Sequence, residues 1–360
     1  MKCKKEVIKY FLVIFFATVT TFPENSMATP VPYISFQDLV SKSDIICKGE
    51  ILQVYKIGES EERARDDGRL LGKISTKVAL VRIDRILKGN ETRETVEVEF
   101  EEVFAGVILP RMILKKGEYV LLFLKGEGER YSFTFKYYGK FRAKIPVSRK
   151  ELQIGAEGSN PSTLVQQELL NSLRDVRSNI VLPSLIGLEG IKSKAAIMYI
   201  ENLLDSNDLA VKGQALSTLI NIGSINHIVE AINYIDEQPA TKAQDVYKTK
   251  IIYALGNIRD ANAVPLLHTL LKHQNTLVRC EVARSLRRIK SQSSIPYLVD
   301  GLDDINLEVK YQCMMGLAKM LGKGGDWAPA YKIFLEDESK PISLWKAWWQ
   351  NEGKAEFGFK

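Results

Sequence analysis

The stretch that decides the fold runs from Thr276 to Leu321, TLVRCEVARSLRRIKSQSSIPYLVDGLDDINLEVKYQCMMGLAKML. Its apolar residues recur three and four positions apart, which is the spacing of one face of an α-helix. The same pattern returns after 31 residues, with Val278, Ala283, Leu286 and Ile289 corresponding to Val309, Met314, Leu317 and Met320. A second helix is predicted between the two, because Ile295-Pro296 opens another apolar run and proline suits a first helical turn.

This register extends toward the N-terminus. Val211 and Tyr247 fall in the same column, so four first helices begin 36, 31 and 31 residues apart. The longer spacing coincides with an insertion of about five residues at 237–241, between helices. A helix pair that repeats at this period buries its apolar face by stacking on its neighbours. The sequence therefore predicts an α-solenoid over residues 164–350, followed by a tail at 351–360.

The N-terminal half has the period of strands. Turn sequences with glycine separate the apolar runs, which predicts a small barrel or sandwich over residues 29–155. The segment 58–72 is polar and charged, and we interpret it as a mobile hairpin insertion on the surface. The predicted strands lie within residues 45–55, 77–87, 95–100, 119–124, 131–138 and 140–145.

The order of these runs and turns resembles exported bacterial β-domains related to the OB-fold barrel of the netrin and metalloproteinase-inhibitor modules. It is carried by the sequences SDIICKGEI (43–51), VRIDRILKG (81–89), KGEYVLLFL (116–124) and YGKF (138–141). The resemblance implies an OB-like barrel. The inhibitors reach a metal with a tethered N-terminal cysteine, and this chain has no cysteine near its predicted mature N-terminus, so that activity is not carried over.

The helical half resembles the short HEAT repeats, including the variant found in phycobilin lyases. That resemblance implies a partner protein or peptide bound along the repeats. The diiron hydroxylase of this class carries His-Glu pairs, whereas His227, His268 and His273 are each followed by another residue type. We therefore expect no such enzyme. The fold class is multidomain: an N-terminal all-β, OB-like barrel, a linker at 156–163, and an all-α HEAT-repeat solenoid.

The first 28 residues are typical of a secretory signal peptide. Lysines precede an apolar run from Tyr10 to about Phe22, Pro23 ends the run, and small residues at Ser26 and Ala28 mark a cleavage site. The run is shorter than the ~20 residues that a membrane span needs. We expect cleavage after Ala28, a bacterial protein exported to the periplasm or beyond, and no integral span in the mature chain.

Composition narrows the classes of partner. The 360 residues carry a formal net charge of +6 without basic blocks, which disfavours nucleic acid. An exported chain normally forms disulfides, yet only Cys47, Cys280 and Cys313 follow the signal peptide. We expect three buried thiols, with a Cys280–Cys313 bridge as the alternative.

The second helices supply the candidate binding residues. Numbered from Ile197, Ile228, Val264 and Ile295, their positions 0, +3 and +7 are apolar and face the stack. Positions +2 and +5 point outward and form a polar ladder with scattered aromatics. The surface is either ordinary solvated helix or a recognition groove, made of Tyr199, Asn202, Glu230, Asn233, Thr269, Tyr297 and Asp300.

Four tryptophans lie near the C-terminus, at positions 327, 345, 348 and 349. Three of them share one helical face and predict either a cap on the last repeat or an aromatic platform for a sugar or peptide.

The sequence holds no phosphate loop, nucleophile elbow or zinc-helix motif, so we expect no catalytic residues, metal or cofactor. The favoured function is an exported, non-enzymatic scaffold that binds a protein or peptide. The alternative is an accessory or inhibitor module for an extracytoplasmic hydrolase, acting through the β-domain.

Overall fold

The computed structural model describes residues 35–63, 70–104, 113–126, 128–135, 143–149, 160–237 and 242–358. The predicted signal peptide lies outside these residues. From Ile34 onward the contacts of the chain define one compact unit. Within the described residues, no helix is both long and apolar enough to cross a bilayer.

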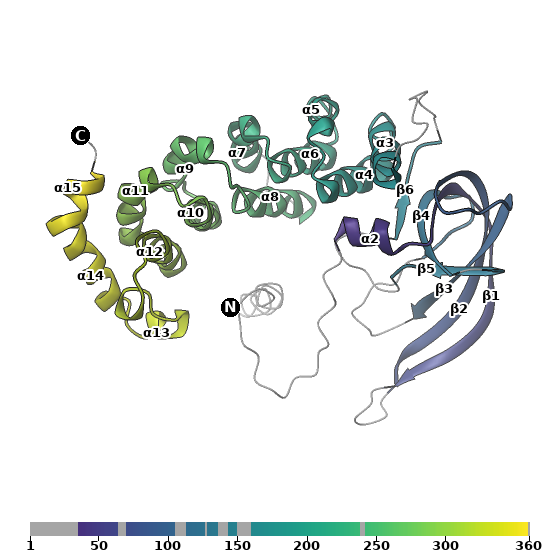
Figure 1. The fold of residues 1–360 in the computed structure, drawn as a ribbon, viewed down its shortest axis with the longest axis horizontal. Coiled ribbons are helices and arrows are strands. Elements are labelled where there is room, and N and C mark those ends of the chain that lie inside the picture. Colours follow the sequence, from purple (N-terminus) through teal and green to yellow (C-terminus); the bar gives the residue numbers. More distant parts are fainter. Residues whose placement is uncertain are drawn as a thin grey trace, which may run out of the picture. The chain divides into compact units, whose positions relative to one another are not determined.

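The N-terminal region is a mixed sheet that closes on itself (Figure 1). Its order is β1-β2-β3-β5-β4-β6, and an additional antiparallel pairing joins β1 to β4. The β3–β5 contact is parallel. The prediction of an all-β domain ahead of the repeats is thus confirmed as a six-stranded near-barrel. The strands are β1 (Ile45–Arg63), β2 (Leu70–Lys88), β3 (Thr95–Phe104), β4 (Tyr119–Lys125), β5 (Arg130–Phe133) and β6 (Lys144–Pro146).

Strand β4 is the centre of this core. Its five residues from Val120 to Leu124 are fully buried, as the continuous apolar run predicts. A helix that the sequence analysis missed, α2 (Phe36–Lys42), packs on the sheet, with the Phe36 ring edge-on to Phe123 at 5.8 Å between centroids. Ser35 and Asp38 form a capping box at its start.

The hairpin segment 58–72 is more regular than we predicted. Its described flanks continue the antiparallel ladder of β1 and β2, with Gly58 opposite Thr76 and Glu62 opposite Gly72. Residues 64–69, at the turn, lie outside the described residues. The hairpin is present, and its base is an antiparallel strand pair that continues, with register shifts at Lys56/Gly58 and Glu62/Arg63, up to the turn.

The C-terminal region is a series of helix pairs, which confirms the predicted all-α repeat architecture (Figure 1). After α3 (Pro161–Ser172), the first helices are α4 (Ser178–Ile191), α6 (Leu209–Asn221), α8 (Lys242–Leu255), α10 (Thr276–Ile289) and α12 (Leu307–Leu321). The second helices are α5 (Ile197–Glu201), α7 (Ile228–Glu237), α9 (Val264–Leu270) and α11 (Ile295–Asp300). Each second helix begins at the residue predicted for it, after a 3₁₀ turn.

Burial follows the predicted register of the second helices. Position 0 is buried in α7, α9 and α11, and position +3 is buried in all four. The solenoid was predicted to start at residue 164, after the linker. Its first helix, α3, begins three residues earlier, at Pro161, and the Asn160 side chain accepts a hydrogen bond from the Thr163 amide. Asparagine is a strong N-cap, and proline fits the first helical turn.

The described chain ends in α13 (Tyr331–Glu336), α14 (Ser339–Trp348), a π-helical turn at Trp349–Gly353 and α15 (Lys354–Phe357). Trp345 is fully buried, packs edge-on against Trp327 at 4.8 Å and donates its indole N–H to the Trp327 carbonyl at 2.7 Å. Trp348 is also buried. Indoles held in this way leave no open aromatic platform at these two positions.

The three cysteines of the described residues are buried free thiols. Cys280 and Cys313 lie on α10 and α12 without a bond between them. Burial raises the pKa of Cys47 and of Cys280 to about 12. These thiols therefore act as small apolar groups of the core.

Candidate functional site

A hollow in the described repeats lies between two inter-repeat loops. It has a volume of about 410 Å³. One wall is the loop that follows α9, and the other is the loop that follows α11. Two of the predicted ladder residues, Tyr297 and Asp300, line it together with His268, Arg279 and Ile305.

A histidine and a tyrosine from successive second helices form the floor. The rings of His268 and Tyr297 stack at 3.3 Å between centroids and an interplanar angle of 24°. His268 Nε2 is buried and has no hydrogen-bond partner among the described residues. Burial lowers the pKa of His268 to about 4, so the ring is neutral at pH 7.

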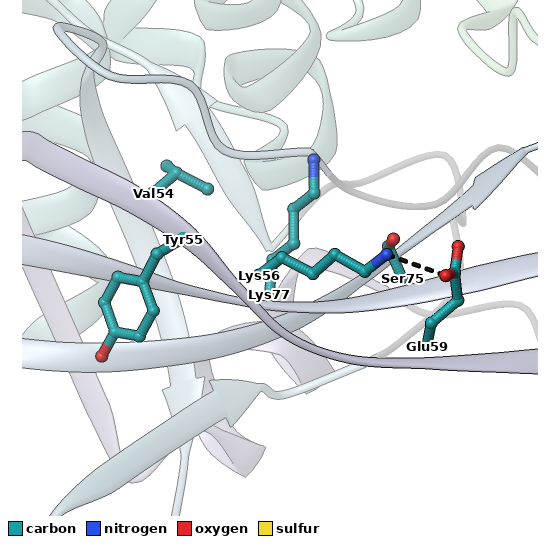
Figure 2. Close-up of a pocket in the computed structure, with 6 residues that line it drawn as sticks. All are labelled: Val54, Tyr55, Lys56, Glu59, Ser75 and Lys77. Atoms are coloured by element: carbon teal, nitrogen blue, oxygen red, sulfur yellow. Dashed lines mark ion pairs between the residues drawn. The ribbon is translucent and has the colours of Figure 1, made fainter.

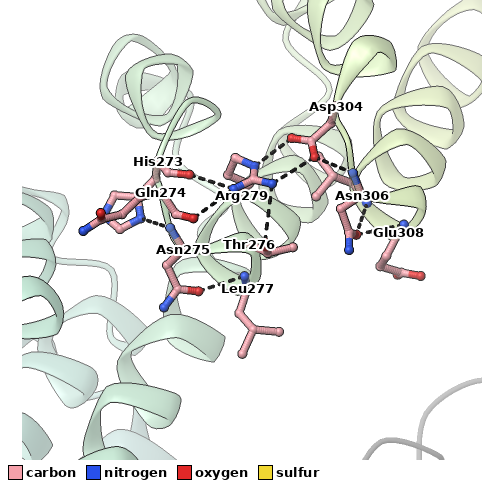
Figure 3. A network of polar contacts seen from close by, with 10 residues as sticks. His273, Gln274, Asn275, Thr276, Leu277, Arg279, Asp304, Asn306 and Glu308 are labelled. Carbon is pink, nitrogen blue, oxygen red and sulfur yellow. Dashed lines mark hydrogen bonds and ion pairs between the residues drawn. The ribbon is translucent and has the colours of Figure 1, made fainter. Parts of the chain in front are cut away.

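A buried ion pair fixes the two loops to each other. Arg279 on α10 donates to both carboxylate oxygens of Asp304, from Nε at 2.7 Å and from Nη2 at 3.0 Å. Its Nη1 also donates to the carbonyls of His273 and Gln274 at 2.9 and 3.2 Å. One guanidinium thus holds the loop before its own helix and the loop of the next repeat (Figure 3).

The charges of this pair are mutually stabilised. The Asp304 hydrogen bonds raise the pKa of Arg279 above its ordinary value. Burial alone would raise the pKa of Asp304, but the bonds from Arg279 and from the Asn306 amide outweigh it and lower that pKa. The pair is therefore a fixed part of the pocket wall and is ionised throughout the physiological range.

Each loop also repeats one turn geometry. Asp304 accepts a hydrogen bond from the Asn306 amide at 2.8 Å, and His273 Nδ1 accepts one from the Asn275 amide at 3.0 Å. Asn306 and Asn275 then cap α12 and α10. In the second loop, Ile305 lies between Asp304 and Asn306, and it is 94% exposed. A large apolar side chain is thus held in solvent at the pocket rim by a rigid turn.

Three aspartates and two basic residues, Lys272 and Arg279, line the pocket. Asp303 pairs with Lys346, and Asp304 pairs with Arg279. The Asp300 side chain is exposed and has no hydrogen bond or ion pair with the described residues, and Lys272 is exposed as well. The pocket therefore offers a carboxylate, an apolar edge and an aromatic floor to a side chain of another molecule.

The structure brings only part of the predicted ladder together. All four residues at +5 are exposed and all four at +2 are half-buried, so the two positions face outward as expected. Tyr297 and Asp300 share the pocket, whereas the others lie along the row outside it. Of these, Tyr199 packs on the Arg174 guanidinium at 5.9 Å and Glu230 pairs with Lys212 at 3.4 Å. The remaining members are Asn202, Asn233 and Thr269.

Sequence reasoning missed three residues of this site: His268, Arg279 and Asp304. For His268 the sequence shows only that no glutamate follows it. A signal for Asp304 exists, because a short polar side chain two residues before the N-cap occurs before α6 and again before α12, as Ser206 and Asp304. The partnership of Arg279 with Asp304 depends on how the repeats stack, which no single repeat shows. Within the described residues, no group of three or more His, Cys, Asp or Glu side chains is arranged to hold a metal.

A second hollow of about 460 Å³ lies on the β1–β2 hairpin (Figure 2). Val54, Tyr55, Lys56, Glu59, Ser75 and Lys77 line it. Its charged groups pair locally: Lys56 with Glu59 at 2.9 Å, and Lys77 with Glu102. The Tyr55 hydroxyl donates to Glu97 at 2.6 Å. The charged side chains and the tyrosine hydroxyl of this hollow are thus paired within the sheet.

Comparison with known proteins bears on the repeats. Residues 237–318 match the family model of HEAT repeats. A curated relative, deoxyhypusine hydroxylase of Danio rerio, is 29% identical over 123 residues, which is 33% of this chain and 39% of the relative. The chain thus spans well under half the length of that relative, and it lacks the His-Glu pairs described above for a diiron hydroxylase.

Two solved structures of engineered proteins are similar to part of this chain. One is 22% identical with a TM-score of 0.28, covering 44% of this chain and 79% of the other. The second is 18% identical with a TM-score of 0.30, covering 52% of this chain and 59% of the other.

Proposed function

We propose that the protein is an exported, non-enzymatic scaffold that binds a segment of a partner protein or peptide on the outward face of its second helices. The observation that carries this proposal is the pocket of about 410 Å³ at the inter-repeat loops. HEAT repeats generally bind proteins, which agrees with a pocket built from two successive repeats.

The pocket suits one anchoring side chain of a peptide. Tyr297 and the Ile305 side chain offer apolar surface, and Asp300 offers an unpaired carboxylate beside it. A lysine or arginine of the partner would place its methylene stem on the aromatic ring and its charge at Asp300. The Arg279–Asp304 pair keeps both walls in place, so little ordering is needed upon binding.

Export is part of the proposal and rests on the sequence of residues 1–28. It is tested by mass spectrometry of the native protein, which should begin at Thr29. Detection of a peptide from the first nine residues in the final protein would argue against cleavage.

The binding proposal is tested with a photo-crosslinking residue at position 300 in the full-length chain, expressed in its own organism. We expect an adduct that forms at position 300 and is lost when Tyr297→Ala is added. The same crosslinker at Lys125, an exposed residue of β4 in the N-terminal sheet, is the control. Equal adducts at both positions, or an adduct unaffected by Tyr297→Ala, would contradict a role for the pocket.

A further inference from the structure

The first helices carry a second set of polar residues, and of the residues that line the pocket above it shares only a helix, α10, with Arg279. Counted from Val211, Tyr247, Val278 and Val309, the positions −1, +3, +6 and +10 share one helical face. Position +3 is polar in all four repeats, where Gln214, Glu281 and Gln312 are buried, and position +10 is polar in all four as well. The residues are Gln214, Lys250, Glu281 and Gln312 at +3, and Asn221, Asn257, Arg288 and Lys319 at +10.

Hydrogen bonds link these positions between repeats. Lys250 Nζ donates to Gln214 Oε1 at 2.6 Å, and Asn257 Nδ2 donates to Asn221 Oδ1 at 3.0 Å. Farther along, Arg287 Nη1 donates to Gln312 Oε1 at 2.9 Å. The side chains are thus held in a defined arrangement across α6, α8, α10 and α12.

Helix α10 concentrates guanidinium groups on this surface. Arg284 is neutralised, because it lies 2.6 Å from Glu281 and 3.6 Å from Glu308. Arg287 and Arg288 differ from it in their acceptors. Among the described residues, Arg287 bonds only to the amide oxygen of Gln312, and Arg288 bonds to the carbonyl of Gly256 and the amide of Asn257.

Both arginines are half-buried without a carboxylate in hydrogen-bond contact. Burial lowers the pKa of Arg287 and of Arg288, and neighbouring guanidinium groups, Arg284 for both and Arg259 for Arg288, lower them further. Each guanidinium has five N–H donors, and the bonds above use only Nη1 of each. Planar donors are therefore left for an anion at a place where positive charge is in excess.

One glycine makes room for a charged side chain of α10. A Cβ on Gly256, which follows α8, would lie 2.0 Å from Glu281 Oε2. The chain after α8 therefore approaches this carboxylate with bare backbone. The arrangement is a packed feature of the stack and not a set of loose surface side chains.

Apolar side chains are exposed on the same helical face. Val246 and Tyr253 on α8 are 52% and 40% exposed, and Leu277 on α10 is 41% exposed. They occupy positions −1, +6 and −1 of two helices that pack against each other. A partner would meet apolar contacts and unneutralised guanidinium groups together.

We propose that this surface binds an acidic, amphipathic segment of a partner protein, with its carboxylates on Arg287 and Arg288 and its apolar side chains on Val246, Tyr253 and Leu277. Carboxylates match the planar donors of arginine in a bidentate manner. The apolar neighbours favour a peptide over a nucleic acid, whose charged backbone would leave them uncovered. Glu281 and Glu308 also repel a multiply charged phosphate more strongly than a single carboxylate.

The test uses the full-length chain and a fluorescent peptide of repeated Glu-Glu-Leu units, with binding followed by anisotropy. The variant Arg287→Gln/Arg288→Gln should weaken binding by about tenfold or more, which corresponds to the loss of charge-assisted hydrogen bonds. Lys332→Gln/Lys354→Gln removes the same charge from exposed positions on α13 and α15 and should leave the affinity within about twofold. Arg287→Lys/Arg288→Lys keeps the charge without the planar donors and should fall between the two.

Thermal unfolding of each variant separates a binding effect from loss of the fold. A Glu-Glu-Ser peptide should bind more weakly than the leucine peptide, because it lacks the apolar contacts. If both charge-removing variants weaken binding equally, the peptide responds only to the net charge of the protein, and the proposal is overturned. Absence of peptide binding, or tighter binding of a single-stranded oligonucleotide, would overturn it as well. None of these outcomes depends on position 300, so the pocket proposal is tested separately.

Discussion

The ammonium nitrogen of Lys48 and Oε2 of Glu168 lie 2.7 Å apart, with side-chain exposures of 0% and 6%. Lys48 belongs to β1 and Glu168 to α3, so the pair joins the sheet to the first helix of the repeat region. Arg85 on β2 adds a second contact to Glu168 at 3.1 Å. The apolar core is also continuous from the sheet into the repeats. The sheet and the adjoining repeats therefore share an interior.

Removal of one partner should destabilise the protein strongly. Glu168→Gln leaves the buried Lys48 ammonium without a carboxylate and should cost about 3–5 kcal/mol in the free energy of unfolding. Lys48→Met should cost less, because Arg85 still pairs with the Glu168 carboxylate. The double change Lys48→Met/Glu168→Leu should also cost less than Glu168→Gln, because no buried charge is left unpaired. Urea unfolding measures all three.

An exposed pair supplies the control for this cycle. Lys340 and Asp326 lie 3.1 Å apart with exposures of 61% and 69%. Their individual removal should change the free energy of unfolding by about 0–1 kcal/mol. If Lys48→Met lowers the free energy of unfolding no more than Lys340→Met does, the buried pair stabilises the fold no more than an exposed pair.

The register of the stack can be tested by contrasting two sets of residues. Leu286 is fully buried on α10, so Leu286→Ala should cost about 2–5 kcal/mol through the cavity it leaves. Asn202, Asn233 and Asp300 are exposed, and their combined change to alanine should cost about 0.5 kcal/mol or less per residue. Chemical denaturation distinguishes the two results, and unfolding of the triple variant would refute the assignment of faces.

Much of the fold was predictable because local periodicity encodes it. The starts of α7, α9 and α11 follow from apolar spacing, and β4 follows from an uninterrupted apolar run. The site was less accessible. Tyr297 and Asp300 were predicted from position alone, whereas Arg279 acquires Asp304 only when two repeats stack. The binding role proposed for Arg287 could not be predicted from the sequence for a related reason. Whether its guanidinium meets a carboxylate depends on which side chains of α8 and α12 lie beside it.

The cysteines should be unreactive in the folded protein. Cys47 and Cys313 are fully buried and Cys280 nearly so, and burial raises the pKa of Cys47 and Cys280 to about 12. Because the thiolate is the reactive form, a thiol reagent at pH 8 should label none of the three until urea unfolds the chain. Rapid labelling of Cys280 in the native protein would show that α10 and α12 separate readily.

The buried imidazole of His268 should make stability depend on pH. Its pKa is about 4 in the folded protein and 6.5 in the unfolded chain. Between these values the unfolded chain binds the proton and the folded protein does not, so the free energy of unfolding should fall as the pH drops from about 6.5 toward 4.

His268→Phe keeps a ring to stack on Tyr297 but removes the unpaired Nε2, so it should flatten this part of the pH profile without lowering stability at pH 7. His227 is the matched control, because its ring nitrogens contact Ser224 at 2.9 Å and Glu201 at 3.3 Å, so His227→Phe should destabilise at pH 7 by removing those contacts. Thermal unfolding between pH 4 and 7 measures both variants, and a pH profile of His268→Phe that parallels the wild type would show that this ring is not the titrating group.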